Sequence, residues 1–265
     1  MQLSAIPPPH VGIFDSGIGG LSVLRSLRQR LPGCALSYLA DNRYLPYGDK
    51  SADWLTARAL QLTEYLLAQG AGLILVACNT ATMHTIGALR ARWPTVPFVG
   101  VEPGIKPAVL RSRAGRIAVM ATPATLRSAR LQRLIDLHAG DCAVRLLPCT
   151  DLAQAIEQAD DARLSCAVES ACAQARAEAV DVVVLGCTHY PLVADRLAAA
   201  LGPGVYLLDT GEAVASRVQS VLGTAATSGK APGVLTAIAT GDTRPLDLAL
   251  RRWLHEPLRA THRDC

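Results

Sequence analysis

Short apolar runs alternate along the chain with stretches that show the periodicity of amphipathic helices. In the first half, we expect strands at residues 10–14, 35–40 and 73–77 and helices at residues 20–31 and 52–69. This alternation is typical of α/β units on a mostly parallel sheet. In such sheets ligands bind at the carboxyl ends of the strands.

The second half repeats the same plan. We expect strands at residues 116–120, 144–147 and 182–185, and helices at residues 125–138 and 164–179. The segments LILVACNT and VVVLGCTH each place a cysteine just past an apolar run, Cys78 in one and Cys187 in the other. Their separation is 187 − 78 = 109 residues, and a similar shift carries Asp15, at the exit of the first strand, to the vicinity of Thr122. The pattern indicates an internal duplication.

The duplication predicts two domains, which 265 residues are long enough to form. We place the first domain at 1–97 plus 210–265 and the second at 98–209, with the boundary in the proline-rich segment 94–107. The glycine-rich, polar segment 223–233 is expected to be an exposed loop.

The composition favours a globular protein and argues against a membrane-spanning one. Half of the residues are apolar and 18% are charged, which is a globular balance. The longest apolar runs, 71–78 and 182–187, are far shorter than the roughly 20 residues that span a bilayer, and the first residues, MQLSAIPPPH, do not resemble a secretory signal. We therefore expect no membrane partner and a cytoplasmic location.

The distribution of charge and the spacing of the cysteines argue against a nucleic-acid-binding protein and against a zinc protein. The net charge of +4 is scattered, which argues against nucleic-acid binding, and the six arginines between 111 and 133 are interpreted as a solvated helix face. The eight cysteines form no CxxC pair and no zinc-site spacing, so we expect free thiols in a reducing compartment and no metal site.

The first candidate for chemistry is FDSGIGGLSVL, which places Asp15 and Ser16 with three glycines between a strand and a helix. Such a turn can direct backbone N–H groups at an anion, although many glycine-rich turns are only structural. A second turn, LPYGDK, contains Tyr47 and Gly48, and its amides could hold a carboxylate.

Two cysteine motifs are more specific. In ACNTAT, Cys78 leaves a buried strand, and Asn79, Thr80 or Thr82 can cap the next helix. The field of that helix is expected to lower the thiol pKa from its reference of ~8.5. In GCTHYP, Thr188 and His189 follow Cys187, and a histidine can exchange protons near neutral pH. The alternatives are a buried packing cysteine and a structural histidine.

Six other cysteines lack comparable surroundings and are interpreted as packing or surface residues. They are Cys34, Cys142, Cys149, Cys166, Cys172 and Cys265.

These blocks, with VEPGI and LGCTHYPL, resemble the signature blocks of the glutamate racemase family, in the same order and over most of the chain. VMATPATLRS, LLDTGEAVASRV and ATGD match it less closely. The resemblance implies a two-domain, pseudosymmetric α/β fold with the active site in the interdomain cleft, no cofactor, a homodimer, and a role in supplying D-glutamate for peptidoglycan and cell shape.

The resemblance also implies residue roles. Cys78 and Cys187 would be the two acid/base catalysts, acting on opposite faces of the α-carbon of glutamate. The substrate-binding residues would be Asp15, Ser16, Tyr47, Gly48, Asn79, Thr80, Thr188 and His189. The chain departs from the family pattern at PCTDLAQAIE, where Glu157 corresponds to a glutamate that orients the histidine.

Three alternatives remain open at this stage. A racemase for another acidic amino acid, such as aspartate, would share the cleft. A cysteine hydrolase would need one nucleophile, a base and an oxyanion hole, and would leave the second cysteine unexplained. A binding module for small acidic ligands would need neither thiol.

Overall fold

The strands of this protein form two separate parallel sheets, as a computed structural model describing residues 9–223 and 232–265 shows. The larger sheet has the strand order β10-β9-β2-β1-β3-β4. Its strands are β1 (His10–Asp15), β2 (Ala35–Ala40), β3 (Leu73–Val76), β4 (Phe98–Gly100), β9 (Leu235–Ala239) and β10 (Thr261–His262). We call this sheet with its covering helices the larger unit.

The smaller sheet has the order β6-β5-β7-β8 and defines the smaller unit. Its strands are β5 (Arg116–Ala121), β6 (Ala143–Pro148), β7 (Val182–Leu185) and β8 (Tyr206–Leu208). The order β6-β5-β7-β8 repeats β2-β1-β3-β4 strand for strand, so β1 corresponds to β5 and β3 to β7. The expected α/β fold with two mostly parallel sheets is confirmed.

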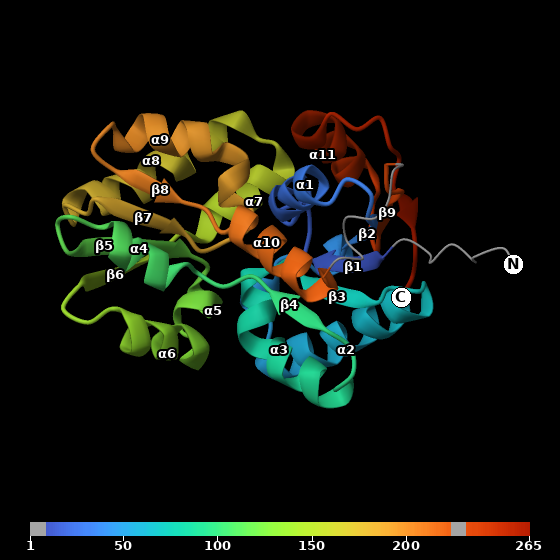
Figure 1. Cartoon of the computed structure of the whole chain (residues 1–265). Helices are drawn as coiled ribbons and strands as arrows, with labels where there is room; N and C mark the ends of the chain where they lie inside the picture. The colour runs from blue at the N-terminus through green and yellow to red at the C-terminus, as the bar shows by residue number, and fades with distance from the viewer. Residues whose placement is uncertain (1–8, 224–231) are drawn as a thin grey trace, which may run out of the picture.

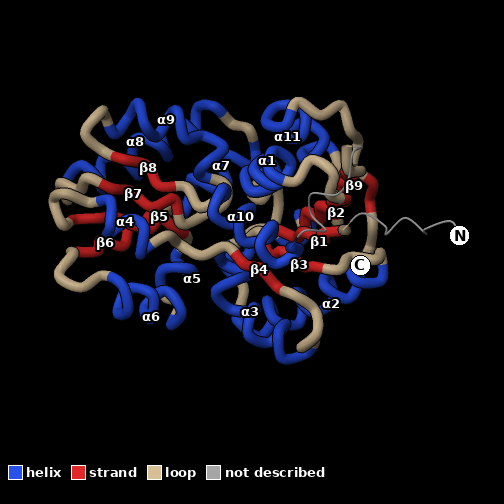
Figure 2. Tube along the Cα trace, in the orientation of Figure 1, coloured by secondary structure: helices blue, strands red, loops and turns tan. Residues whose placement is uncertain are grey.

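Helices cover both faces of each sheet (Figures 1 and 2). In the larger unit, α1 packs with α10 and α11 on one face, and α2 packs with α3 on the other. Their bounds are α1 (Leu21–Arg30), α2 (Ala52–Ala68), α3 (Asn79–Arg92), α10 (Gly211–Leu222) and α11 (Arg244–Leu254). Strands covered on both faces are apolar at successive positions, which explains why residues 73–76 and 182–185 are buried throughout.

The smaller unit is built in the same way. Helix α8 packs against α7 and α9 on one side, and α4 packs against α6 on the other. Their bounds are α4 (Ile105–Arg111), α5 (Pro123–Leu126), α6 (Ala129–His138), α7 (Thr150–Gln158), α8 (Asp161–Ala177) and α9 (Ala194–Leu201). Three short 3₁₀ turns complete the described elements: η1 (Asn42–Tyr44), η2 (Tyr47–Asp49) and η3 (Tyr190–Val193).

The expectation of one helix over residues 125–138 is wrong. Helix α5 ends at Leu126 and α6 begins at Ala129, because the Ser128 side chain accepts a hydrogen bond from the Leu131 amide and caps a new helix. The arginines of this region lie largely on the surface, as expected. Arg127 and Arg133 are exposed, and Arg130 is half-buried and pairs with Glu102.

The chain crosses between the units twice, at residues 101–104 and 209–210. The crossings lie against each other, since a Cβ on Gly104 would stand 2.6 Å from Leu208 Cδ2. We propose the division 1–97 plus 210–265 and 98–209, with one adjustment. Because β4 pairs with β3, the first crossing follows Gly100, and the segment 94–107 contains a strand and a helix start.

Two further expectations concern the rest of the chain. Most of the expected loop at 223–233 lies outside the described residues. Among the helices of residues 9–223 and 232–265, none is long and apolar enough to cross a membrane.

Candidate active site

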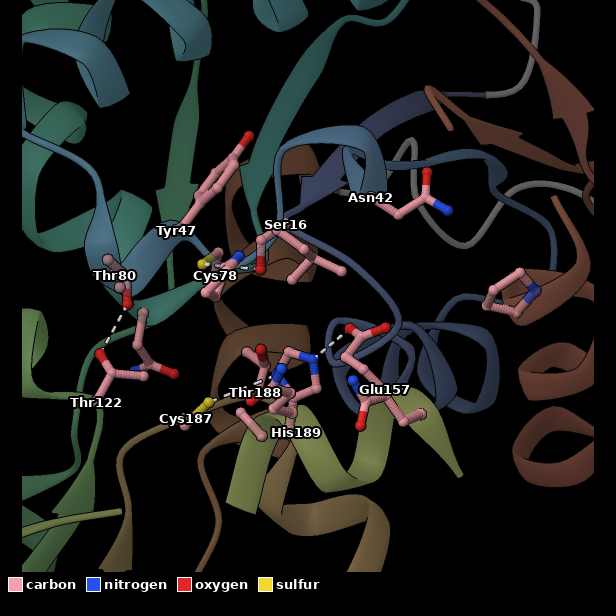
Figure 3. A pocket seen from close by; sticks show the side chains of 18 of the residues that line it. Ser16, Asn42, Tyr47, Cys78, Thr80, Thr122, Glu157, Cys187, Thr188 and His189 are labelled. Atoms are coloured by element: carbon pink, nitrogen blue, oxygen red, sulfur yellow. Dashed lines mark hydrogen bonds and ion pairs between the residues drawn. The ribbon is translucent and has the colours of Figure 1, made fainter. Parts of the chain in front are cut away.

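A cavity of about 390 Å³ lies between the two units, at the carboxyl ends of their strands (Figure 3). Cys78, which follows β3, and Cys187, which follows β7, both line it, from opposite sides in the view of Figure 3. The other sequence-predicted residues that line the cavity are Ser16, Tyr47, Gly48, Asn79, Thr80, Thr188 and His189. Asp15 lies behind Ser16, fully buried.

Cys78 occupies the position just before α3, as expected from sequence, but its electrostatics differ from the expectation. Its side chain is buried, with Sγ 4.0 Å from Ser16 Oγ. Burial raises the pKa of Cys78 well above its usual range, the Asp15 carboxylate raises it further, and the backbone N–H of Ala81 offsets only part of this. The expected lowering of the Cys78 pKa is therefore wrong, because loss of hydration outweighs the field of the helix.

The glycine-rich turn after β1 binds the protein's own carboxylates. The Asp15 carboxylate accepts hydrogen bonds from the Ser16 amide at 2.7 Å and the Gly20 amide at 2.5 Å. Burial raises the pKa of Asp15 to about 6, against the lowering effects of His189 and the Gly20 amide. The Ile18 amide donates at 2.8 Å to Glu157 of the smaller unit. These amides are thus not free for an external anion.

On the opposite side, Cys187 is the first member of a hydrogen-bonded row. Cys187 Sγ lies 3.5 Å from His189 Nδ1, and His189 Nε2 lies 2.5 Å from Glu157 Oε1. Burial alone would lower the pKa of His189, but Cys187 and Glu157 together raise it well above 6.5. The structure therefore places Glu157 where the resemblance implied, beside the histidine.

Two glycines of the turn allow this row to approach the larger unit. A Cβ on Gly17 would stand 2.0 Å from Glu157 Oε1, and a Cβ on Gly19 would stand 2.4 Å from His189 Nδ1. Real Cβ atoms do not approach other atoms so closely, so either substitution must displace the side chain. FDSGIGG is thus a slot into which the smaller unit inserts its histidine and glutamate.

Tyr47 is anchored from behind. Its hydroxyl donates to Asp41 Oδ2 at 2.6 Å, and Asp41 is held by Arg58 Nη2 at 2.6 Å and by the Thr240 hydroxyl at 2.8 Å. This buried network fixes η2 and therefore the backbone of Gly48 at the cavity wall.

Asn79 and Thr80 present polar groups from the first turn of α3. The Asn79 side-chain NH₂ donates to the Val101 carbonyl at 3.4 Å, whereas its buried Oδ1 has no hydrogen-bond partner among the described residues. Thr80 Oγ1 lies 3.0 Å from Thr122 Oγ1, which belongs to the smaller unit. Asn79 Oδ1 is thus a buried acceptor whose hydrogen-bonding capacity is unused by the described residues.

Sequence reasoning did not identify every residue of the cavity wall. Thr122 entered only as the duplicated counterpart of Asp15. On α7 only Glu157 was assigned, and neither the residues of η1 nor those that follow β9 were assigned. These additional lining residues include Asn42, Arg43, Gln154, Gln158, Gly241 and Asp242. The weak ATGD block, residues 239–242, was the available signal for the C-terminal part.

The remaining cysteines behave as packing and surface residues. Cys34, Cys149 and Cys172 are buried, Cys166 is exposed, and all eight thiols are free. Within the described ranges, no group of three or more His, Cys, Asp or Glu side chains is placed to hold a metal ion.

Comparison with known proteins assigns the family. The profile of the Asp/Glu/Hydantoin racemase family matches residues 20–218. A glutamate racemase from Ectopseudomonas mendocina is 46% identical over 219 residues, which is 80% of this chain and 82% of that protein.

Solved structures of glutamate racemases share the fold of this chain. The structure of a glutamate racemase isoform from Bacillus anthracis has a TM-score of 0.86 at 28% identity and covers 97% of each chain. That of Escherichia coli glutamate racemase, in complex with L-glutamate and an activator, has a TM-score of 0.85 at 31% identity, covering 93% of this chain and 96% of that one. The chain therefore belongs to the Asp/Glu/hydantoin racemase family, a family of isomerases, and groups there with the glutamate racemases.

Proposed function

We propose that this protein interconverts L- and D-glutamate by moving a proton on and off the α-carbon with Cys78 and Cys187, without a cofactor. One observation carries the proposal: two thiols from corresponding strand ends of a duplicated fold face one cavity. Inversion requires removal of a proton from one face of the α-carbon and delivery of a proton to the other. A single-nucleophile hydrolase would leave one of these thiols without a role.

The surroundings of the two sulfurs support an assignment of which thiol is protonated before substrate binds. We assign the starting thiolate to Cys187 because its Sγ lies 3.5 Å from His189 Nδ1, where the raised pKa of His189 keeps a positive charge and Glu157 holds the ring. The raised pKa of Cys78 keeps that thiol protonated. Cys187 then takes the α-proton while Cys78 donates its own to the other face. The opposite enantiomer reverses the roles.

The rest of the cavity stabilises the charge that this transfer creates. An α-proton is a very weak acid, and enzymes generally lower such barriers by roughly 8 kcal/mol or more. Negative charge builds on the substrate carboxylate as the proton leaves, and the hydroxyls of Thr80 and Thr188 are donors in reach of the cavity. Asn79 Oδ1 can accept from the substrate ammonium. Exclusion of water strengthens each of these contacts.

Glutamate is the substrate that we propose, on the strength of the relatives named above. The η2 turn, with Tyr47 and Gly48, would hold the side-chain carboxylate, and its anchoring by Asp41 would fix the distance from the thiols. We further propose that the enzyme acts in the cytoplasm as a homodimer and supplies D-glutamate for peptidoglycan. Complementation of a bacterial strain that requires D-glutamate for growth tests this last role.

The direct test is incubation of the purified protein with L- or D-glutamate in heavy water, with no cofactor added. We expect loss of optical rotation together with entry of deuterium at the α-carbon. Cys78→Ser and Cys187→Ser should each abolish racemisation, whereas Cys166→Ser, an exposed cysteine outside the cavity, should leave it unchanged. Normal turnover by either of the first two variants refutes the mechanism. Faster turnover of aspartate than of glutamate refutes the substrate assignment.

A further inference from the structure

Three threonine hydroxyls meet where α3 of the larger unit contacts α5 of the smaller unit. Thr80 Oγ1 lies 3.0 Å from Thr122 Oγ1 and 3.2 Å from Thr125 Oγ1, and the Thr122 hydroxyl donates to Thr125 Oγ1 at 3.1 Å. Thr80 and Thr122 line the cavity, whereas Thr125 is fully buried and does not. The third hydroxyl therefore lies behind the two that a substrate can touch.

Each hydroxyl has one proton, so the arrangement has a direction. The Thr125 amide donates to Thr122 Oγ1 at 3.3 Å, and Thr122 gives its proton to Thr125 Oγ1. Thr125 then has Thr80 Oγ1 as its acceptor. The Thr80 proton then closes the ring on Thr122 Oγ1 at 3.0 Å, and because Thr80 lines the cavity, this proton can turn from Thr122 to a bound substrate. A hydroxyl that accepts a hydrogen bond is a better donor, because chains of hydrogen bonds polarise one another.

We propose that Thr125 is a positioning residue for the reaction, whose hydroxyl joins Thr80 to Thr122 across the cleft and holds Thr80 where its proton can turn from Thr122 to the substrate. The proposal rests on the proposed function for its catalytic consequence. Its structural consequence is independent, because the same hydroxyl holds the two units together at the first turn of α3, which begins beside Cys78.

The test replaces Thr125 with valine, which has nearly the same shape and lacks the hydroxyl. We expect kcat/KM for glutamate to fall about three- to tenfold, the effect of losing one hydrogen bond, with a lower kcat as well as a higher KM because the carboxylate gains negative charge in the transition state. Thr125→Ser, which keeps the hydroxyl, should restore kcat/KM. Thr63→Val is the matched control, since Thr63 is equally buried, lies on α2 and has no hydrogen-bond partner among the described residues.

A second measurement needs no substrate. Cys78 is only 5% exposed, so its alkylation by iodoacetamide requires the cleft to open. Peptide mass spectrometry of the labelled protein should show Cys78 reacting several-fold faster in Thr125→Val than in wild type, with Cys34 unchanged. If the wild type fails to racemise glutamate, the proposed function falls and the alkylation rate alone decides this inference. Wild-type behaviour of Thr125→Val in both measurements, or a serine variant as impaired as the valine one, overturns it.

Discussion

Cys78 and Cys187 occupy corresponding places in the two units, yet their neighbours differ in charge. Cys78 lies near the Asp15 carboxylate, whereas Cys187 lies beside the His189 imidazole, which is itself supported by Glu157. The duplicated fold therefore provides symmetric positions for the sulfurs and asymmetric control of their protons. Two predictions follow from the titratable groups behind the thiols.

The first concerns Asp15, whose pKa is raised to about 6 from the usual 3.8. Its carboxylate form is therefore lost as the pH falls through about 6, and a protonated carboxyl no longer accepts from both the Ser16 and Gly20 amides. We expect kcat/KM to fall below pH 6 in wild type. Asp15→Asn should be less active and should lack this acidic limb. A limb that persists unchanged in Asp15→Asn would assign it to another group.

The second concerns His189. The Glu157 carboxylate contributes to raising the pKa of His189. Glu157→Gln should therefore lower that pKa and decrease the fraction of His189 that is protonated beside Cys187. NMR titration of the nitrogen-labelled imidazole, assigned with a His189→Asn variant, measures the shift. We expect kcat to decrease in parallel. An unaltered imidazole titration in Glu157→Gln contradicts the role given to Glu157.

At the scale of elements, the turn between β1 and α1 has a different function from the one its sequence indicates. Its amides bind Asp15 and Glu157, and its glycines make room for His189 and Glu157. A glycine-rich turn before a helix is usually considered for external anions. Here the anions are carboxylates of the same chain, and one of them comes from the other unit.

This packing predicts the effect of a single methyl group. Gly19→Ala should displace His189 and reduce kcat/KM by at least tenfold, because the added Cβ would lie 2.4 Å from His189 Nδ1. Gly87→Ala is the control, since nothing lies within 4 Å of its Cβ and alanine favours a helix by about 0.5–1 kcal/mol. Steady-state kinetics and thermal unfolding of both variants make the comparison. Full activity of Gly19→Ala would show that the slot is not tight.

The sequence predicts these elements well where periodicity is strong and poorly where side-chain contacts decide. The strands at 35–40 and 182–185 have the expected limits, because both are buried and bounded by turns. The break before α6 depends on one serine hydroxyl, Ser128, which periodicity does not detect. The pKa of Cys78 depends on burial in a cleft that only the tertiary structure creates, so the sequence does not predict the direction of its shift.

At the scale of the whole molecule, the site exists only when both units meet. Ser16, Cys78 and Thr80 come from the larger unit, and Thr122, Cys187 and His189 from the smaller one. The Ser22 hydroxyl adds a direct contact, donating to the Thr188 carbonyl at 2.8 Å. The duplicated cysteine motifs made a shared cleft predictable, but Gln154 and Gln158 of α7 carry no motif that points to it, and the residues after β9 have only the weak ATGD block.

A ligand bound between the units should stabilise them jointly. We expect glutamate at 100 times its dissociation constant to stabilise the folded protein by about 2.7 kcal/mol, the value that mass action gives. Thermal unfolding at increasing glutamate concentration measures this, with aspartate as the comparison. Stabilisation by aspartate at lower concentrations than by glutamate would argue against the proposed substrate.

The return of the chain to the larger sheet sets an order for folding during synthesis. Strand β9 pairs with β2 and is followed by Thr240, which anchors Asp41, yet both arrive from the ribosome more than 190 residues after β2. The smaller unit is contiguous in sequence and can finish earlier. Until β9 is synthesised, the larger unit therefore has an unpaired edge at β2. Unpaired strand edges promote aggregation. Truncation before β9 should leave that edge permanently unpaired.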